Sequence, residues 1–210
     1  MESLQSNNIY NLIEEGVIED VNSVLPLTSG LTLLQTAAMD CDERLVDFLL
    51  SKQADVNLTN QEWGTALHIA VKKQNLKIIQ SLIDCGADVN AKIPVDPRFT
   101  QLQLAVRRKS IEIAELLLEN GADIDSGSTG NESYSIKLPN KPVSLEKTPL
   151  HMAIHQGNKE MVELLLKKNA NPNIFSTRAT PLDTAVRKGN LKVMKLLLAH
   201  DTDVNGSKNE

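Results

Sequence analysis

The chain has 210 residues, of which 41% are hydrophobic, so it is long enough to bury a sizeable core. It contains no apolar run of the length that spans a membrane, and its N-terminal stretch lacks the apolar segment of a secretory signal. A net charge of −5 and only 3% aromatic residues argue against nucleic-acid binding. We therefore expect a soluble protein with neither a membrane nor a nucleic acid as its partner.

Five copies of one segment follow each other along the chain. Each copy reaches a closing motif of the type Ala-Asp-Val-Asn 22 residues after its opening threonine, which is Thr32, Thr65, Thr100, Thr148 or Thr180. The spacing from each closing motif to the next threonine varies, at 11, 13, 26 and 10 residues. A repeat of this kind buries its apolar face only by stacking on copies of itself.

A degenerate copy precedes these five. From about Asn7, "IYNLIEEGVIEDVNSVL" parallels "LDTAVRKGNLKVMKLLL" of the last copy, which predicts about six repeats. In chain order, we predict repeats at 1–30, 31–63, 64–99, 100–147, 148–179 and 180–210, the last of them truncated. Residues 126–147 are rich in Ser, Gly, Asn and Pro and too long for an ordinary connector. We expect a mobile loop there that either binds a partner or is filler.

Within each copy, apolar residues recur at spacings of three and four, as at Leu67, Ala70 and Val71. This pattern predicts two short amphipathic helices, and the opening threonine is placed to cap the first. Glycine occupies the turn between the helices in only two copies, at Gly157 and Gly189. We expect a strained turn in the other three, at Cys41, Gln74 and Lys109.

The last copy ends with the same apolar pattern as the internal ones. A terminal repeat normally carries a polar outer face, so we expect Val193, Met194 and Leu197 to be exposed there. Two cysteines, Cys41 and Cys85, are too few for a disulfide framework, and we expect free thiols in a reducing compartment. The protein is therefore expected in the cytoplasm or nucleus. An alternative is delivery into a host cell.

The motifs "TPLHMA", "TALHIA", "LLLENGADID" and "LIDCGADVNA" resemble the ankyrin repeat family, over nearly the whole chain outside 126–147. The resemblance implies an all-α solenoid of stacked helix-turn-helix units joined by β-hairpin-like loops. It also implies a non-enzymatic module that binds proteins through its concave face and loop tips. Three copies, with "TLLQ", "TQLQ" and "TPLD", lack the family's histidine, so we expect weaker junctions there.

His68 and His151 are candidate catalytic bases or metal ligands, but no cysteine or carboxylate recurs beside them. In the family, the histidine of this motif bridges neighbouring backbones, which favours a structural role. The sequence also has no glycine-rich phosphate loop and no nucleophile-base motif. We therefore predict no enzymatic activity, no cofactor and no metal.

In the family's layout, the residues seven and eight positions after each opening threonine face the concave groove. Six of these ten are basic and one is acidic; the basic ones are Lys72, Lys73, Arg107, Arg108, Arg187 and Lys188. They form either a basic stripe that binds an acidic segment of a partner or only a solvated face. Repeat 5 interrupts the stripe with His155 and Gln156.

The connectors carry three aromatic residues, Trp63, Phe99 and Phe175. Trp63 and Phe99 are candidate anchors for a partner, although they could equally pack against a neighbouring loop. Together these features predict a monomeric protein-protein interaction module. The alternatives are the substrate-recognition part of a longer adaptor or effector that recruits degradation machinery, or a competitive inhibitor of a transcription factor.

Overall fold

The computed structural model describes residues 6–24, 30–93, 99–127, 147–175, 179–200 and 202. These residues form eleven helices and no strand: α1 (Ser6–Glu14), α2 (Leu33–Asp40), α3 (Glu43–Ser51), α4 (Ala66–Lys73), α5 (Leu76–Asp84), α6 (Gln101–Arg108), α7 (Ile111–Glu119), α8 (Pro149–His155), α9 (Lys159–Lys167), α10 (Pro181–Arg187) and α11 (Leu191–Leu198). The chain divides into two compact units, an N-terminal unit (Met1–Leu104) and a C-terminal unit (Ala105–Glu210).

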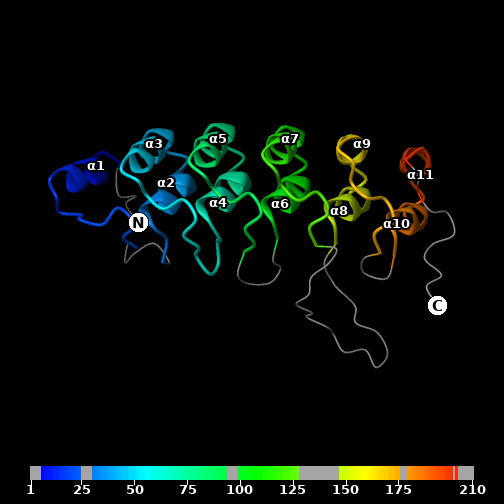
Figure 1. Cartoon of the computed structure of the whole chain (residues 1–210), viewed down its shortest axis with the longest axis horizontal. Helices are drawn as coiled ribbons and strands as arrows, with labels where there is room; N and C mark the ends of the chain where they lie inside the picture. Colours follow the sequence, from blue (N-terminus) through cyan, green and yellow to red (C-terminus); the bar gives the residue numbers. More distant parts are fainter. Residues whose placement is uncertain are drawn as a thin grey trace, which may run out of the picture. The chain divides into compact units, whose positions relative to one another are not determined.

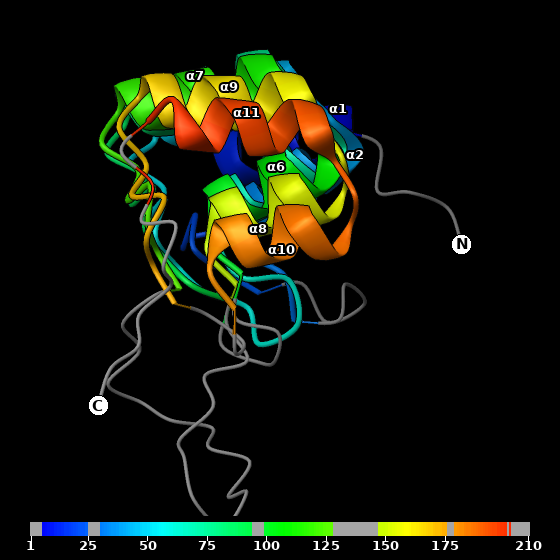
Figure 2. The same cartoon turned by 90° about the vertical axis from the view of Figure 1, so that its right-hand side faces the viewer.

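From α2 onward the helices come in pairs, each with a first and a second helix. In the N-terminal unit, first helices α2 and α4 lie side by side, as do second helices α3 and α5 (Figure 1). In the C-terminal unit, α8 lies beside α10, while α9 lies between α7 and α11 in the other row (Figure 2). Leu67 on a first helix and Leu165 on a second helix are both fully buried and belong to the core.

Each first helix begins at its predicted threonine cap. The side chains of Thr32, Thr65, Thr148 and Thr180 accept a hydrogen bond from the backbone N–H three residues on. Thr100 Oγ1 accepts one from the Gln103 N–H at 3.3 Å. These bonds satisfy backbone donors that a helix otherwise leaves open. The predicted caps are therefore confirmed.

The copies that lack histidine still complete the cap. Gln35 Oε1 accepts from the Thr32 N–H at 3.0 Å, Gln103 Oε1 from that of Thr100 at 2.9 Å, and Asp183 Oδ2 from that of Thr180 at 2.9 Å. Gln35 Nε2 also donates to the Leu58 and Gly64 carbonyls of the following loop, at 2.9 and 3.1 Å. We expected a weaker junction at this repeat because it lacks the family's histidine. Gln35 nevertheless makes hydrogen bonds both to the cap and to the following loop.

The turns between paired helices are left-handed in every described case. Cys41, Gln74 and Lys109 have φ values of 59°, 61° and 60°, close to the 67° and 66° of Gly157 and Gly189. Side chains rarely adopt this conformation, so the strain expected at these three turns is confirmed. Gly86 and Gly121, both at φ 84°, follow second helices, where a left-handed glycine commonly ends a helix.

The first repeat departs from the expected register. Only one helix, α1, lies in residues 6–24, and residues 15–24 form turns instead of a second helix. Asn22 Oδ1 accepts the Asp55 N–H at 2.8 Å, just as Asn57 Oδ1 accepts the Asp88 N–H at 2.8 Å. Helix α1 therefore stands where a second helix belongs, and the expected two-helix alignment was wrong. The reason is spacing: Asp20 follows Gly16 by four positions, whereas Asp88 follows Gly86 by two.

The closing motifs bond to one another in both units. In the N-terminal unit, Asn57 also donates its Nδ2 to the Gly86 carbonyl at 3.1 Å. In the C-terminal unit, the Asp125 carboxylate accepts the Asn171 N–H at 3.1 Å. We call this series of side chain to backbone bonds between successive closing motifs the closing ladder. It joins the ends of neighbouring second helices.

The last helix pair buries residues that we expected to be exposed. Val193 and Leu197 are each 0% exposed, because α11 packs on α9 and α10. The expectation for these two was wrong, since the apolar pattern alone does not show which residues face α9. Other apolar residues are exposed instead: Leu191 at 69%, Val186 at 54% and Leu198 at 49%.

Cys41 and Cys85 are exposed free thiols, as predicted. The greater part of the predicted insertion, residues 128–146, lies outside the described residues, so its mobility stays a prediction. Among the helices of the described chain, none combines the length and the hydropathy that crossing a membrane requires.

Candidate functional site

The six predicted basic residues all lie where a first helix ends. Lys72 and Lys73 end α4 in the N-terminal unit, Arg107 and Arg108 end α6, and Arg187 and Lys188 close α10 in the C-terminal unit. Lys72 is half-buried and the other five are exposed. Cations at a helix C-terminus are also stabilising in themselves. A single groove that joins all six stays a prediction, because they are divided between the two units.

Two of the predicted site residues meet in the N-terminal unit. The Lys72 ammonium lies over the ring of Trp63, 4.7 Å from its centroid, and Trp63 is half-buried. A cation over the face of an indole is attracted by the negative potential of the ring. Lys73 follows on the same helix and is exposed. Charge and aromatic surface are therefore combined at one place, which we call the Trp63 patch (Trp63, Lys72 and Lys73).

A tight turn fixes the position of Trp63. The backbone groups of Asn60 and Gly64 exchange hydrogen bonds of 2.8 and 2.9 Å, and Asn60 Oδ1 accepts the Trp63 N–H at 3.0 Å. Gly64 has a φ of 76°, and a Cβ there would come within 2.9 Å of the His68 ring. Only glycine fits such a close approach. The turn therefore holds the indole beside α4.

The other two loop aromatics behave differently. Phe99 is half-buried, and its carbonyl accepts the Ile93 N–H at 3.4 Å, so its backbone helps to close the loop before α6. Phe175 is 56% exposed. Their role as anchors stays a prediction.

His68 and His151 are built into the framework. His68 is 0% exposed, and its Nδ1 accepts the Thr65 N–H at 3.1 Å. His151 Nε2 donates to the Ala179 carbonyl at 3.1 Å, while its Nδ1 accepts from the Thr148 hydroxyl at 2.7 Å. Burial lowers the pKa of each imidazole to about 4, against the opposing effect of the Phe99 and Ala179 carbonyls. Both rings are therefore neutral at pH 7. His151 bridges its own cap and the Ala179 carbonyl, and His68 completes the cap at Thr65.

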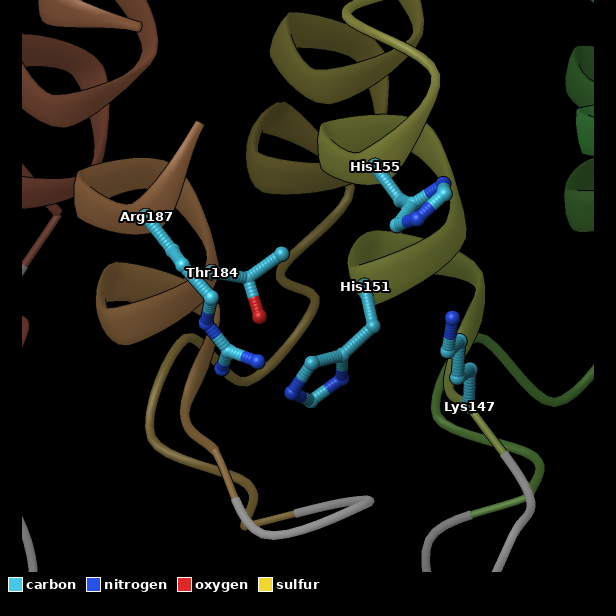
Figure 3. A pocket seen from close by; sticks show the side chains of 5 residues that line it. All are labelled: Lys147, His151, His155, Thr184 and Arg187. Carbon is cyan, nitrogen blue, oxygen red and sulfur yellow. The ribbon is translucent and has the colours of Figure 1, made fainter. Parts of the chain in front are cut away.

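The C-terminal unit has a small pocket that the sequence did not lead us to. It has a volume of about 60 Å³ and is lined by Lys147, His151, His155, Thr184 and Arg187. Figure 3 shows the Arg187 guanidinium, the Thr184 hydroxyl and the His151 ring close to one another, with Lys147 and His155 on the side of the His151 ring that faces away from Arg187. We call it the basic pocket. Its signal was the spacing of four that joins Lys147, His151 and His155, whereas we had treated His155 as an interruption.

The basic pocket has a positive electrostatic potential. Lys147 and, to a smaller extent, Lys188 lower the pKa of His155, because each disfavours a second nearby positive charge. This arrangement of an ammonium, a guanidinium and a hydroxyl is suited to holding an anion. Within the described part of the chain, no group of three His, Cys, Asp or Glu side chains is arranged to hold a metal ion.

The comparison with family models matches this architecture. A model of ankyrin repeats in three copies matches residues 1–93, 34–128 and 131–208, which is most of the chain. The chain belongs to the ankyrin repeat family. Its all-α fold of stacked helix pairs is that of the family, as predicted. Ankyrin repeats are generally protein-protein interaction modules, and they are generally non-catalytic.

A curated ankyrin repeat protein of Borreliella burgdorferi is similar to part of this ankyrin repeat chain. The two are 32% identical over 99 residues, which make up 44% of the chain and 21% of the relative. The matched stretch thus spans about a fifth of that relative. The similarity extends the family assignment and adds no partner.

Proposed function

We propose that this ankyrin repeat protein is a non-catalytic module that binds an acidic segment of a partner protein. The observation that carries the proposal is the Trp63 patch, where the Lys72 ammonium lies 4.7 Å from the indole centroid beside the exposed Lys73. A carboxylate of the partner would pair with the two ammonium groups, and an apolar neighbour would cover the indole. Aromatic and basic residues together are typical of interface anchors.

The basic residues of the C-terminal unit support the same function. Arg107, Arg108, Arg187 and Lys188 end their helices as Lys72 and Lys73 do, and all four are exposed. Exposed cations raise the association rate with an acidic partner and make that rate sensitive to salt. The partner therefore would associate more slowly at high ionic strength.

The proposal is tested by selecting binders from a random peptide display library with the full chain as bait. We expect selected peptides to be enriched in Asp and Glu. The K72E/K73E double variant should weaken their binding at least tenfold, since two attractive charge contacts become repulsive. Trp63→Ala should weaken it too, because the apolar contact is lost. Affinities are measured by fluorescence anisotropy at two salt concentrations.

Arg44→Glu, paired with the single variant Lys73→Glu, is the matched control. Both positions are exposed in the N-terminal unit and both variants change the net charge by the same amount, but Arg44 lies on second helix α3. Selection of neutral or basic peptides would contradict the proposal. So would an equal loss of binding in the Arg44 variant, which would show only a long-range effect of net charge.

A further inference from the structure

The basic pocket brings side chains from two repeats of the C-terminal unit to one point. Lys147 precedes α8, His151 and His155 lie on α8, and Thr184 and Arg187 lie on α10 (Figure 3). They include a guanidinium, an ammonium and a hydroxyl, all of which donate hydrogen bonds to anions. The hydroxyl of Thr184 points toward the centre of the group.

The pocket has room for a small anion. A cavity needs about 10–15 Å³ to hold one water, so a volume of about 60 Å³ exceeds what a single water needs.

The one acidic residue of α10, Asp183, takes part in the cap of that helix. Asp183, the neighbour of Thr184, uses its Oδ2 to accept from the Thr180 N–H and hydroxyl, both at 2.9 Å. Among the described residues, no ion pair is formed by Arg187. Towards α6, the Gln156 amide donates to the Arg107 carbonyl at 3.5 Å. In the part of the chain that the structure describes, the charged groups that lower the pKa of His155 are Lys147 and Lys188, and Arg187 lines the same pocket.

We propose that the basic pocket binds the phosphate group of a phosphorylated side chain in the partner's acidic segment. The dianionic phosphate would accept from the Arg187 fork, the Lys147 ammonium and the Thr184 hydroxyl, and its charge would match the two permanent cations. This inference rests on the proposed function, because the phosphorylated residue belongs to the acidic segment that the module is proposed to bind. The Trp63 patch lies in the other unit and does not contribute to it.

The direct test needs no partner. Protein with labelled histidine is titrated with N-acetyl-phosphoserine amide, at constant ionic strength, and the His155 ring is followed by NMR. We expect a saturable shift and a rise in the pKa of His155, since a bound dianion offsets the effect of Lys147 and Lys188. Unphosphorylated N-acetyl-serine amide should cause neither.

Variants locate the binding. Arg187→Gln should weaken it about tenfold, because a hydrogen bond between charged groups is lost. Thr184→Val should weaken it less. Lys192→Gln removes one exposed charge from α11, away from the pocket, and should leave binding unchanged. An equal effect of Lys192→Gln, or an equal response to chloride at matched ionic strength, would overturn the proposal in favour of a diffuse cationic surface.

A second arm identifies the source of the phosphate. We expect an acidic peptide with one phosphoserine to bind at least tenfold more tightly than its unphosphorylated form, and Arg187→Gln to remove that difference. Binding to phosphoinositide vesicles without any preference for the phosphopeptide would overturn the proposal in favour of a lipid surface. If acidic peptides bind through the Trp63 patch but phosphorylation has no effect, this inference fails while the proposed function stands. If phosphoserine amide binds but no acidic peptide does, the proposed function fails on its own.

Discussion

At the scale of single residues, different side chains at the position three after each opening threonine accept the same backbone hydrogen bond. His68 accepts the backbone N–H of Thr65, and Gln35 accepts that of Thr32 with an amide oxygen. The imidazole can take up a proton, whereas the amide cannot. The chain therefore contains its own non-titrating replacement for the family histidine.

This difference gives the folded state a predictable pH dependence. The pKa of His68 and of His151 is lowered by burial to about 4 in the folded state, against about 6.5 when unfolded. Their contribution to stability is complete above pH 6.5 and is lost as the pH falls toward 4, because only the unfolded chain binds protons there. Each histidine accounts for about 3 kcal/mol over that window.

We expect the double variant H68Q/H151Q to lose less stability than the wild type between pH 6.5 and pH 4, as measured by urea denaturation. Gln35 shows that glutamine can make the cap and the bonds to the next loop. His200→Gln, at an exposed histidine, is the control and should keep the wild-type pH profile. An unchanged profile in the double variant would mean that other groups cause the acid sensitivity.

At the scale of elements, the turn between paired helices carries a cost at three of its five positions. Gln74, in the N-terminal unit, has a φ of 61°. Gly189, at the equivalent turn of the last helix pair, has a φ of 66°. The left-handed conformation costs a residue with a side chain about 1–2 kcal/mol. Replacement by glycine removes this cost, but part of the gain is lost because glycine loses more backbone entropy on folding. We expect Gln74→Gly to stabilise the protein by up to about 1 kcal/mol and Gly189→Ala to destabilise it by a similar amount. Thermal denaturation measures both, and a loss of stability in Gln74→Gly would contradict this account.

The last helix makes a second element-scale prediction possible. Leu197 is 0% exposed and Leu191 is 69% exposed, although both are leucines on α11. Leu197→Ala should cost about 2–5 kcal/mol of unfolding free energy, because it leaves a cavity in the core. Leu191→Lys should change stability by less than about 0.5 kcal/mol. Similar costs for the two, in the same denaturation assay, would show that α11 is packed differently.

These elements also show what the sequence could predict. The helix pairs, the threonine caps and the strained turns followed from local spacing, because capping and turn conformation depend on residues a few positions apart. The register of the first repeat did not follow, since two added residues between Gly16 and Asp20 shifted the alignment. The contact of Lys72 with Trp63 depends on the path of a loop, and the basic pocket depends on how α10 stacks on α8. Neither is encoded by one periodic pattern.

At the scale of the whole molecule, stability in a repeat protein is the sum of the repeats and of the couplings between neighbours. The closing ladder is one such coupling, and Asn57 makes two of its bonds, to Asp88 and Gly86. We expect Asn57→Ala to cost about 1–3 kcal/mol and to broaden the urea transition, because the repeats on either side would unfold less cooperatively. Gln61→Ala, at an exposed connector position, is the control. A loss of stability without broadening would show that the ladder does not transmit cooperativity.

The closing ladder also bears on how the gene can change in length. Its bonds join the ends of second helices, so they leave the connector between a closing motif and the next threonine out of the coupling. The longest connector, 26 positions from Ala122 to Thr148, begins beside Asp125, and the bond from Asp125 to Asn171 is still made across it. The length of this connector therefore does not prevent the ladder bond, and selection can act on loop length there. The same freedom is denied to the 22-residue body, whose length is identical in all five copies.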